Sequence, residues 1–146
     1  MEFDMKEYGT LARVKTAQDA EKVFLKLKDT GFSYCQLVFK PDIYKEEDAK
    51  IIKDAVDKTG IKITALFAGF KDNFTKWNIS TDYKDAGINS KKYGKGRIKY
   101  VKQAAWFASL LGVEDILIHA GFVANNPYSA EYKFMVKKVT EVAKHC

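Results

Sequence analysis

Four short apolar runs alternate with four longer amphipathic stretches along the chain. The runs are rich in β-branched or aromatic residues and are bounded by turn residues, which predicts β-strands at 8–14, 33–39, 61–68 and 115–121. Apolar residues at helical spacing follow each run, and the first three helices are predicted to end at Gly31, Gly60 and Gly112. A helical crossover returns the chain to the sheet in the same direction, so we expect parallel strands. The predicted fold class is α/β, built from four βα units.

Four βα units are half of a (β/α)₈ TIM barrel. Such barrels typically need about 250 residues, whereas this sequence has 146. The fourth predicted helix carries Tyr132, Met135 and Val139 on its apolar face and reaches the end of the sequence without a capping glycine. We therefore expect one domain over residues 1–146 that corresponds to the N-terminal half of a barrel, a half-barrel fragment.

The composition is that of a soluble globular protein. It is 47% hydrophobic, 14% aromatic and 30% charged, which excludes a disordered or fibrous chain. The sequence has no apolar run near the roughly 20 residues that span a bilayer and no N-terminal signal-peptide pattern. No membrane association and a cytoplasmic location are expected. The two cysteines, Cys35 and Cys146, predict neither a disulfide framework nor a metal site.

The basic charge balance leaves two kinds of partner open. A net charge of +6 and a pI near 9.1 fit either a nucleic-acid surface or an anionic small substrate. Most lysines fall on predicted amphipathic helices, where a solvated face is the simpler explanation. The denser cluster at 89–100 lacks the spacing of a phosphate-binding P-loop.

One connection is long. Residues 70–96, after the third strand, show no clear strand or helix pattern, and a loop of this size in a compact domain is usually functional or disordered. In an α/β barrel a loop that follows a strand lies on the C-terminal face, where active sites are built. Its aromatic residues, Trp77 among them, are expected either to close over a ligand or to plug a gap in the core.

The segment EDILIHAGF at 114–122 carries a histidine at the predicted end of the fourth strand. Strand residues alternate between faces, so His119 shares a face with Leu117 and Gly121. If Leu117 fills the barrel interior, His119 lies at the C-terminal mouth. Gly121, which precedes Phe122, would let the backbone turn and a ligand approach. The alternative is a hydrogen-bonded structural histidine.

Two arginines are further candidates for substrate contact. Arg13, near the end of the first strand, can meet a phosphate through two parallel hydrogen bonds or pair with an acidic residue nearby. Arg97 opens the third helix, where a cation gains nothing from the helix dipole. We expect it to have another partner, either a substrate phosphate or an acidic side chain.

Several motifs together resemble the xylose isomerase-like TIM-barrel superfamily. The sequence carries GTLARV, TGFSYCQLVF, YSAEYKFMVKKV and, most specifically, RIKYVKQAAWFASLLGVEDILIHAGF. These segments are similar to the N-terminal half of its sugar phosphate isomerase/epimerase branch. The resemblance implies a divalent metal, Mn, Mg or Zn, that a full-length relative holds with Glu, Asp and His from the second half of the barrel. It also implies two carboxylates that move a proton beside a sugar carbonyl. No metal site is therefore expected within this chain.

The second strand departs from the pattern of the family. Family members often carry Glu where this sequence has Gln36. An amide can orient a substrate hydroxyl but cannot act as a base. The catalytic residues are therefore unassigned, and the substrate-binding candidates are His119, Arg13, Gln36, Trp77, Arg97, Gly121 and Phe122.

The sequence is compatible with three functions. The first is the N-terminal part of a sugar isomerase or epimerase that binds a small sugar or sugar phosphate. The second is a non-catalytic half-barrel that pairs with itself or another chain, because open edge strands and an inner layer of Leu11, Val38 and Leu117 would be uncovered. Because of these open edges a homo-oligomer is expected. The third, a nucleic-acid binder related to DNA-repair endonucleases, is weakest because LFAGF at 66–70 lacks the histidine that those enzymes use there.

Overall fold

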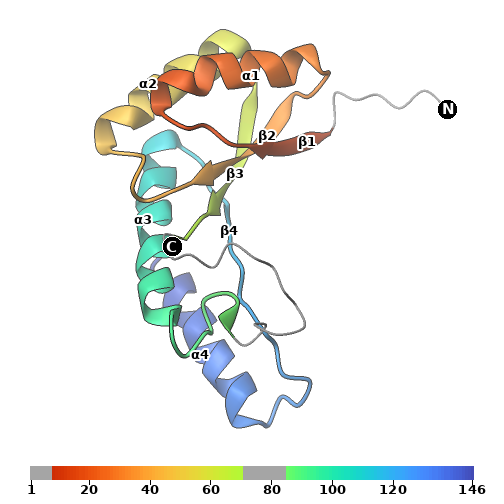
Figure 1. The fold of residues 1–146 in the computed structure, drawn as a ribbon, viewed down its shortest axis with the longest axis vertical. Helices are drawn as coiled ribbons and strands as arrows, with labels where there is room; N and C mark the ends of the chain where they lie inside the picture. The colour runs from red at the N-terminus through yellow and green to blue at the C-terminus, as the bar shows by residue number, and fades with distance from the viewer. Residues whose placement is uncertain (1–7, 71–84) are drawn as a thin grey trace, which may run out of the picture.

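The computed structural model describes residues 8–70 and 85–146 (Figure 1). Its sheet has four parallel strands in the order β1-β2-β3-β4. The strands are β1 (Gly9–Ala12), β2 (Tyr34–Phe39), β3 (Lys62–Ala68) and β4 (Ile116–Leu117). The helices are the short 3-10 helix η2 (Ala17–Asp19), then α1 (Ala20–Asp29), α2 (Glu46–Thr59), α3 (Gly94–Leu111) and α4 (Ala130–Ala143). The predicted α/β fold with four βα units is confirmed.

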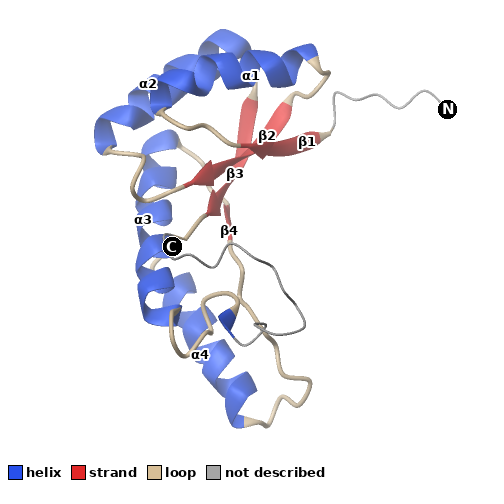
Figure 2. Ribbon diagram, viewed as in Figure 1, coloured by secondary structure: helices blue, strands red, loops and turns tan. Residues whose placement is uncertain are grey.

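Helices α1, α2 and α3 pack on one face of the sheet (Figure 2). Strand residues Cys35, Leu37 and Phe39 point into this layer and are fully buried. They meet helix residues such as Phe24, Ile52 and Phe107 in one continuous core. We call the opposite side of the sheet the inner face, because it faces the interior in a closed barrel.

Local signals end the helices where the sequence predicts. Gly60 and Gly112, which end α2 and α3, both have φ of 72°, a left-handed conformation that glycine adopts without steric cost.

Side chains also cap the starts of two helices. At the start of α2, the Asp48 carboxylate accepts a hydrogen bond from the Lys45 backbone N–H at 2.8 Å. At the start of α4, the Ser129 hydroxyl oxygen accepts one from the Tyr132 N–H at 3.2 Å.

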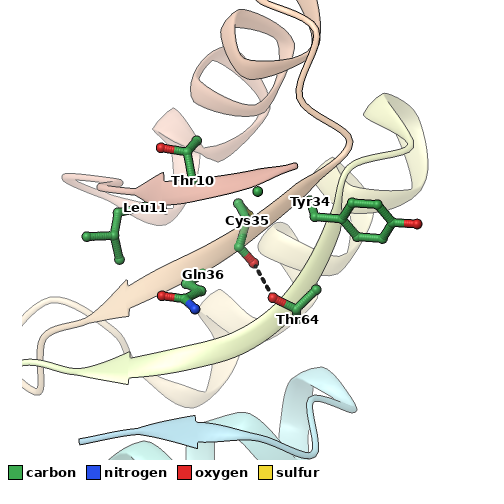
Figure 3. A pocket seen from close by; sticks show the side chains of 7 residues that line it. Thr10, Leu11, Tyr34, Cys35, Gln36 and Thr64 are labelled. Atoms are coloured by element: carbon green, nitrogen blue, oxygen red, sulfur yellow. Dashed lines mark hydrogen bonds between the residues drawn. The ribbon is translucent and has the colours of Figure 1, made fainter. Parts of the chain in front are cut away.

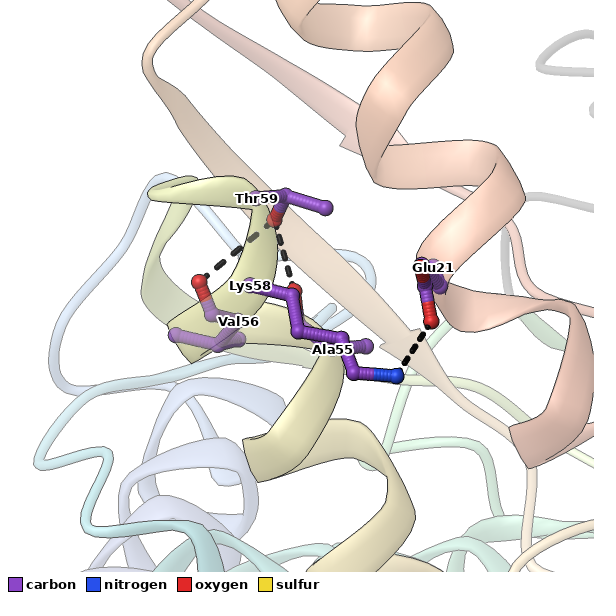
Figure 4. A network of polar contacts seen from close by, with 5 residues as sticks. All are labelled: Glu21, Ala55, Val56, Lys58 and Thr59. Carbon is purple, nitrogen blue, oxygen red and sulfur yellow. Dashed lines mark hydrogen bonds and ion pairs between the residues drawn. The ribbon is translucent and has the colours of Figure 1, made fainter.

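A polar network joins α1 to α2 (Figure 4). Lys58 Nζ lies 2.9 Å from Glu21 Oε2 across the two helices. Both side chains are exposed to solvent, so this ion pair contributes little to stability. The buried Thr59 hydroxyl donates to the Ala55 carbonyl at 2.7 Å, and Lys28 Nζ donates to the Thr59 carbonyl at 2.9 Å. These contacts hold the end of α2 against α1.

The fourth strand is shorter than predicted. The pattern at 115–121 predicts seven strand residues, but β4 contains two. Beyond Leu117 the chain is bonded to a loop segment instead, because His119 and Ala120 carbonyls accept hydrogen bonds from Ile88 and Asn89 N–H groups at 3.0 and 3.1 Å. This loop segment takes the place of a neighbouring strand. His119 therefore lies beyond the end of β4.

The predicted loop at 70–96 overlaps the start of α3, which begins at Gly94. Residues 71–84, including Trp77, lie outside the described residues. The last helix, α4, joins α3 through Val142, which is buried, and through the Lys102–Glu141 ion pair at 3.5 Å. Among the described helices, none is long and apolar enough to cross a membrane.

Candidate functional site

The inner face of the sheet is exposed at its edges and covered at its centre. Strand register places Leu11 beside Gln36, Val38 beside Phe67, and Phe67 beside Leu117. Leu11 and Leu117 are 39% and 41% exposed, whereas Val38 is 7% exposed. The expectation that Val38 is uncovered is wrong, because β2 has a neighbouring strand on each side while β1 and β4 are edge strands.

The carboxyl ends of the parallel strands meet at one edge of the sheet, where α/β barrels build their sites. Alternation from Leu11 places Arg13 on the inner face at the end of β1, and alternation from Val38 places Lys40 at the end of β2. The chain after β4 brings His119 to the same edge. Arg13 and His119 therefore lie at opposite sides of one mouth.

Arg13 lines a cavity of about 250 Å³ between the ends of β1 and β2. Lys15 and Lys40 line it as well, together with Val14, Val38 and Ile43. Neither lysine is among the candidates that the sequence pattern indicates. The strand alternation that places Val38 on the inner face also places Lys40 there, so Lys40 was within reach of the sequence pattern.

Tyr44 ties this region to the core. Its hydroxyl donates to the Val14 carbonyl at 3.0 Å, and its ring stacks on Phe39 and Phe107 at centroid distances of 5.8 and 5.3 Å. Burial raises the pKa of Tyr44 well above its usual range, so the phenol stays protonated and keeps donating. The loop after β2 is thus fastened to the end of β1.

Gln36 lies deeper than Arg13 and lines a different cavity. That cavity, of about 540 Å³, is formed near the amino ends of the strands by Gly9, Thr10, Leu11, Tyr34, Cys35, Gln36 and Thr64 (Figure 3). The Thr64 hydroxyl donates to the Cys35 carbonyl at 3.3 Å. Burial raises the pKa of the Cys35 thiol to about 12, which keeps it protonated and unreactive near neutral pH.

His119 packs on the inner face of the sheet. Its ring meets the Phe67 ring edge-on, with centroids 5.2 Å apart and planes at 80°. The alternation predicted for this segment holds, because Ile116 and Ile118 pack against the helix-side core while Leu117 is exposed. Burial lowers the pKa of His119. At neutral pH the imidazole is therefore uncharged and has one donor and one acceptor nitrogen.

Gly121 turns the chain, as predicted, with φ of 99°. The atoms that lie close to Gly121 belong to this chain and not to a ligand. A Cβ at Gly121 would collide with the Ala86 carbonyl and the Asn89 side chain. The Asn89 amide also donates to the Phe122 carbonyl. Phe122 lines a separate cavity of about 230 Å³ whose other walls include Glu131 and Phe134 of α4. Phe122 and His119 therefore face different surroundings.

Arg97 is 0% exposed. One guanidinium nitrogen donates to the carbonyls of Asp85 and, at 2.8 Å, Gly87. The guanidinium carbon lies 5.0 Å from the ring centroids of both Phe70 and Tyr93. These contacts fasten segment 85–87 to α3 and favour a structural role for Arg97 over contact with a substrate phosphate.

The described residues do not form a complete ligand set for a divalent metal. Within 8–70 and 85–146, no three His, Cys, Asp or Glu side chains lie close enough to hold one ion. Such metals need several converging oxygen or imidazole ligands. His119 is a single imidazole at the mouth, so the described part of the chain does not fit the metal that the resemblance implies.

Two solved structures with the same fold carry names that refer to sugar isomerases or epimerases. No protein-family model and no curated protein matches the sequence. A xylose isomerase domain protein from Planctomyces limnophilus superposes with a TM-score of 0.78 at 22% identity, over 99% of this chain and 51% of that one. The E. coli 3-keto-D-glucoside 4-epimerase YcjR, in its apo form, gives 0.65 at 14% identity, over 96% and 51%. The chain thus has the fold of half a xylose isomerase-like barrel and spans about half the length of these neighbours.

We expect His119 to titrate below the ordinary histidine value of 6.5, because burial disfavours its charged form. The unfolded chain then takes up a proton at His119 before the folded chain does. Stability is therefore lost as pH falls from about 6.5 through the lower folded pKa. NMR titration of the imidazole Hε1 signals, assigned with a His145→Gln variant, measures this. A His119 midpoint at or above 6.5 contradicts the burial argument.

Gly121→Ala is expected to destabilise the fold by about 2 kcal/mol or more, because the left-handed backbone is strained for alanine and the added Cβ collides with segment 86–89. The matched control is Gly96→Ala in the first turn of α3, where a Cβ meets no atom within 4 Å. That change should raise stability by roughly 0.5 kcal/mol. Urea unfolding of both variants gives the comparison, and equal effects would refute the close packing at Gly121.

Proposed function

We propose that this chain, which folds as one half of a xylose isomerase-like barrel, forms part of the substrate site of a sugar isomerase or epimerase. The observation that carries the proposal is the carboxyl edge of the sheet, where Arg13 and His119 border an inner face left open by the described helices. Active sites of such barrels are built at this edge. The names of the two structural neighbours, a xylose isomerase domain protein and a 3-keto-D-glucoside 4-epimerase, support a sugar as the ligand.

The residues of this edge suit a sugar in complementary ways. The neutral His119 imidazole can donate to one hydroxyl or carbonyl oxygen and accept from another hydroxyl. The adjoining Phe67 ring, 5.2 Å from it, offers apolar surface for the C–H face of a sugar. Gln36 lies one layer deeper, where its amide is suited to orient a hydroxyl. In this proposal the described residues bind and orient the sugar.

The proton transfer itself needs a base that these residues do not supply. Isomerisation or epimerisation moves a proton at a carbon beside a carbonyl, and a positioned carboxylate is the usual carrier. The Gln36 amide cannot take a proton. In this proposal the neutral His119 imidazole hydrogen-bonds the sugar and does not act as the base. We therefore assign the catalytic carboxylates to another part of the complete enzyme.

Sugar binding is expected at the carboxyl edge of the sheet. We expect neutral aldoses and ketoses at about 10 mM, a concentration suited to millimolar affinity, to shift the amide NMR signals of His119 and its neighbours. His119→Ala should weaken binding several-fold, because it removes a donor and an acceptor. His145→Ala, at the exposed chain end, is the matched control. Signal changes confined to the helix-covered side, or equal binding by both variants, would contradict the proposal.

A second candidate function is a half-barrel that pairs with another chain. It is favoured by the exposed edge-strand residues Leu11 and Leu117 and by the unpaired edges of β1 and β4 among the described strands. Two such sheets could join edge to edge as an eight-stranded barrel. The inner faces of both copies would then be buried.

Under this second function, light scattering at tens of micromolar should give at least twice the 16.6 kDa chain mass. Leu117→Glu should shift the equilibrium towards monomer, because a carboxylate cannot be buried cheaply in the joined interior. Leu25→Glu is the matched control, since Leu25 on α1 is 43% exposed but lies outside the sheet. A monomer at every concentration, or an equal effect of both variants, argues against pairing.

A further inference from the structure

Three cations converge on the cavity at the ends of β1 and β2. Arg13, Lys15 and Lys40 line it, and all three side chains are exposed to solvent. Within residues 8–70 and 85–146 no carboxylate lines this cavity, although Asp42 follows Lys40 by two residues. Among the described residues, no ion pair or hydrogen bond engages the side chains of Arg13, Lys15 or Lys40. Three like charges around one cavity repel one another, and an anion would relieve that repulsion.

The remaining walls give the cavity a defined shape. Val14, Val38 and Ile43 supply apolar surface, and Val14 is held by the hydrogen bond from the buried Tyr44 hydroxyl. Val38 is nearly buried within the sheet. The cations therefore extend from a backbone that the core already fixes, which lowers the entropy lost when they bind a ligand.

We infer that this cavity binds the phosphoryl group of a sugar phosphate. Arg13 presents a planar fork that matches two phosphoryl oxygens, while Lys15 and Lys40 act as point charges. Pockets for whole drug-sized ligands occupy about 300 to 1,000 Å³, so a cavity of about 250 Å³ suits one small group better than an entire sugar phosphate. The inference rests on the proposed sugar function and narrows its substrates to phosphorylated sugars.

The position of the cavity also orients the ligand. β1 and β4 are separated by three strand spacings, or roughly 14 Å across the sheet at about 4.8 Å each. His119 lies at the β4 side of the mouth and the three cations at the β1 side. The phosphoryl group would therefore sit at the end of the sugar remote from His119, as in a terminal phosphate ester.

Inorganic phosphate alone is the first probe, added to ¹⁵N-labelled chain at low ionic strength. We expect it to shift the backbone amide signals of residues 13–15 and 40. Arg13→Gln and Lys40→Gln should each weaken the apparent affinity about tenfold, and Arg13→Lys should weaken it less, because the charge stays while the fork is lost. Lys50→Gln, an exposed lysine on α2, is the matched control and should change the affinity less than twofold. Circular dichroism checks that each variant folds.

A neutral ketopentose and its terminal phosphate ester are the second pair of probes. Tighter binding of the ester, with the difference abolished in Arg13→Gln but kept in Lys50→Gln, supports the inference. Binding of the neutral sugar at His119 without any phosphate effect at residues 13–15 overturns the phosphoryl site but leaves the sugar function standing. Shifts at residues 13–15 from both phosphate and the ester, with no shift at His119 from either sugar, support the phosphoryl site and overturn the sugar function. Phosphate shifts centred on the lysines at 91–95 instead overturn the inference.

Discussion

The unequal covering of the two faces of the sheet governs the rest of this structure. On one side, Leu37, Phe39 and Leu66 are sealed beneath α1, α2 and α3, and burial on that side supplies the main stabilising free energy. On the inner face, Leu11 and Leu117 are left exposed. A parallel sheet is normally covered on both faces. The inner face is therefore the surface on which a ligand, a second copy or further strands can act.

This asymmetry explains where the polar chemistry is found. Residues at the carboxyl ends of the strands are held by a rigid core on one side and are open on the other. Arg13 and Lys40 are placed by strand alternation, while Tyr44 fixes the connecting backbone through its hydrogen bond to Val14. His119 is positioned by Phe67 and by the backbone bond from Ile88. The edge thus combines a cationic side and a neutral imidazole side around one mouth.

Segment 85–89 is a loop that makes backbone hydrogen bonds of the kind that a neighbouring strand would make. It donates backbone hydrogen bonds to His119 and Ala120, and its carbonyls accept from the buried Arg97. Gly121 lets this segment lie close to the chain after β4. Its position at a helix start made Arg97 a candidate for substrate contact. Its contacts instead hold segment 85–87 against α3. A sequence pattern records that an arginine needs a partner but does not identify backbone carbonyls as that partner.

Local sequence patterns are enough to predict the α/β class, the four βα units, the helix ends at Gly60 and Gly112, and the face on which His119 lies. These features follow from hydrophobic periodicity and backbone preference, which act between residues near one another in the chain. Contacts in the folded chain set the early end of β4, the burial of Val38, the separation of Gln36 from Arg13, and the grouping of Arg13 with Lys15 and Lys40. Each of these depends on which strands and loops become neighbours in space, and that information lies in contacts between residues far apart in the sequence.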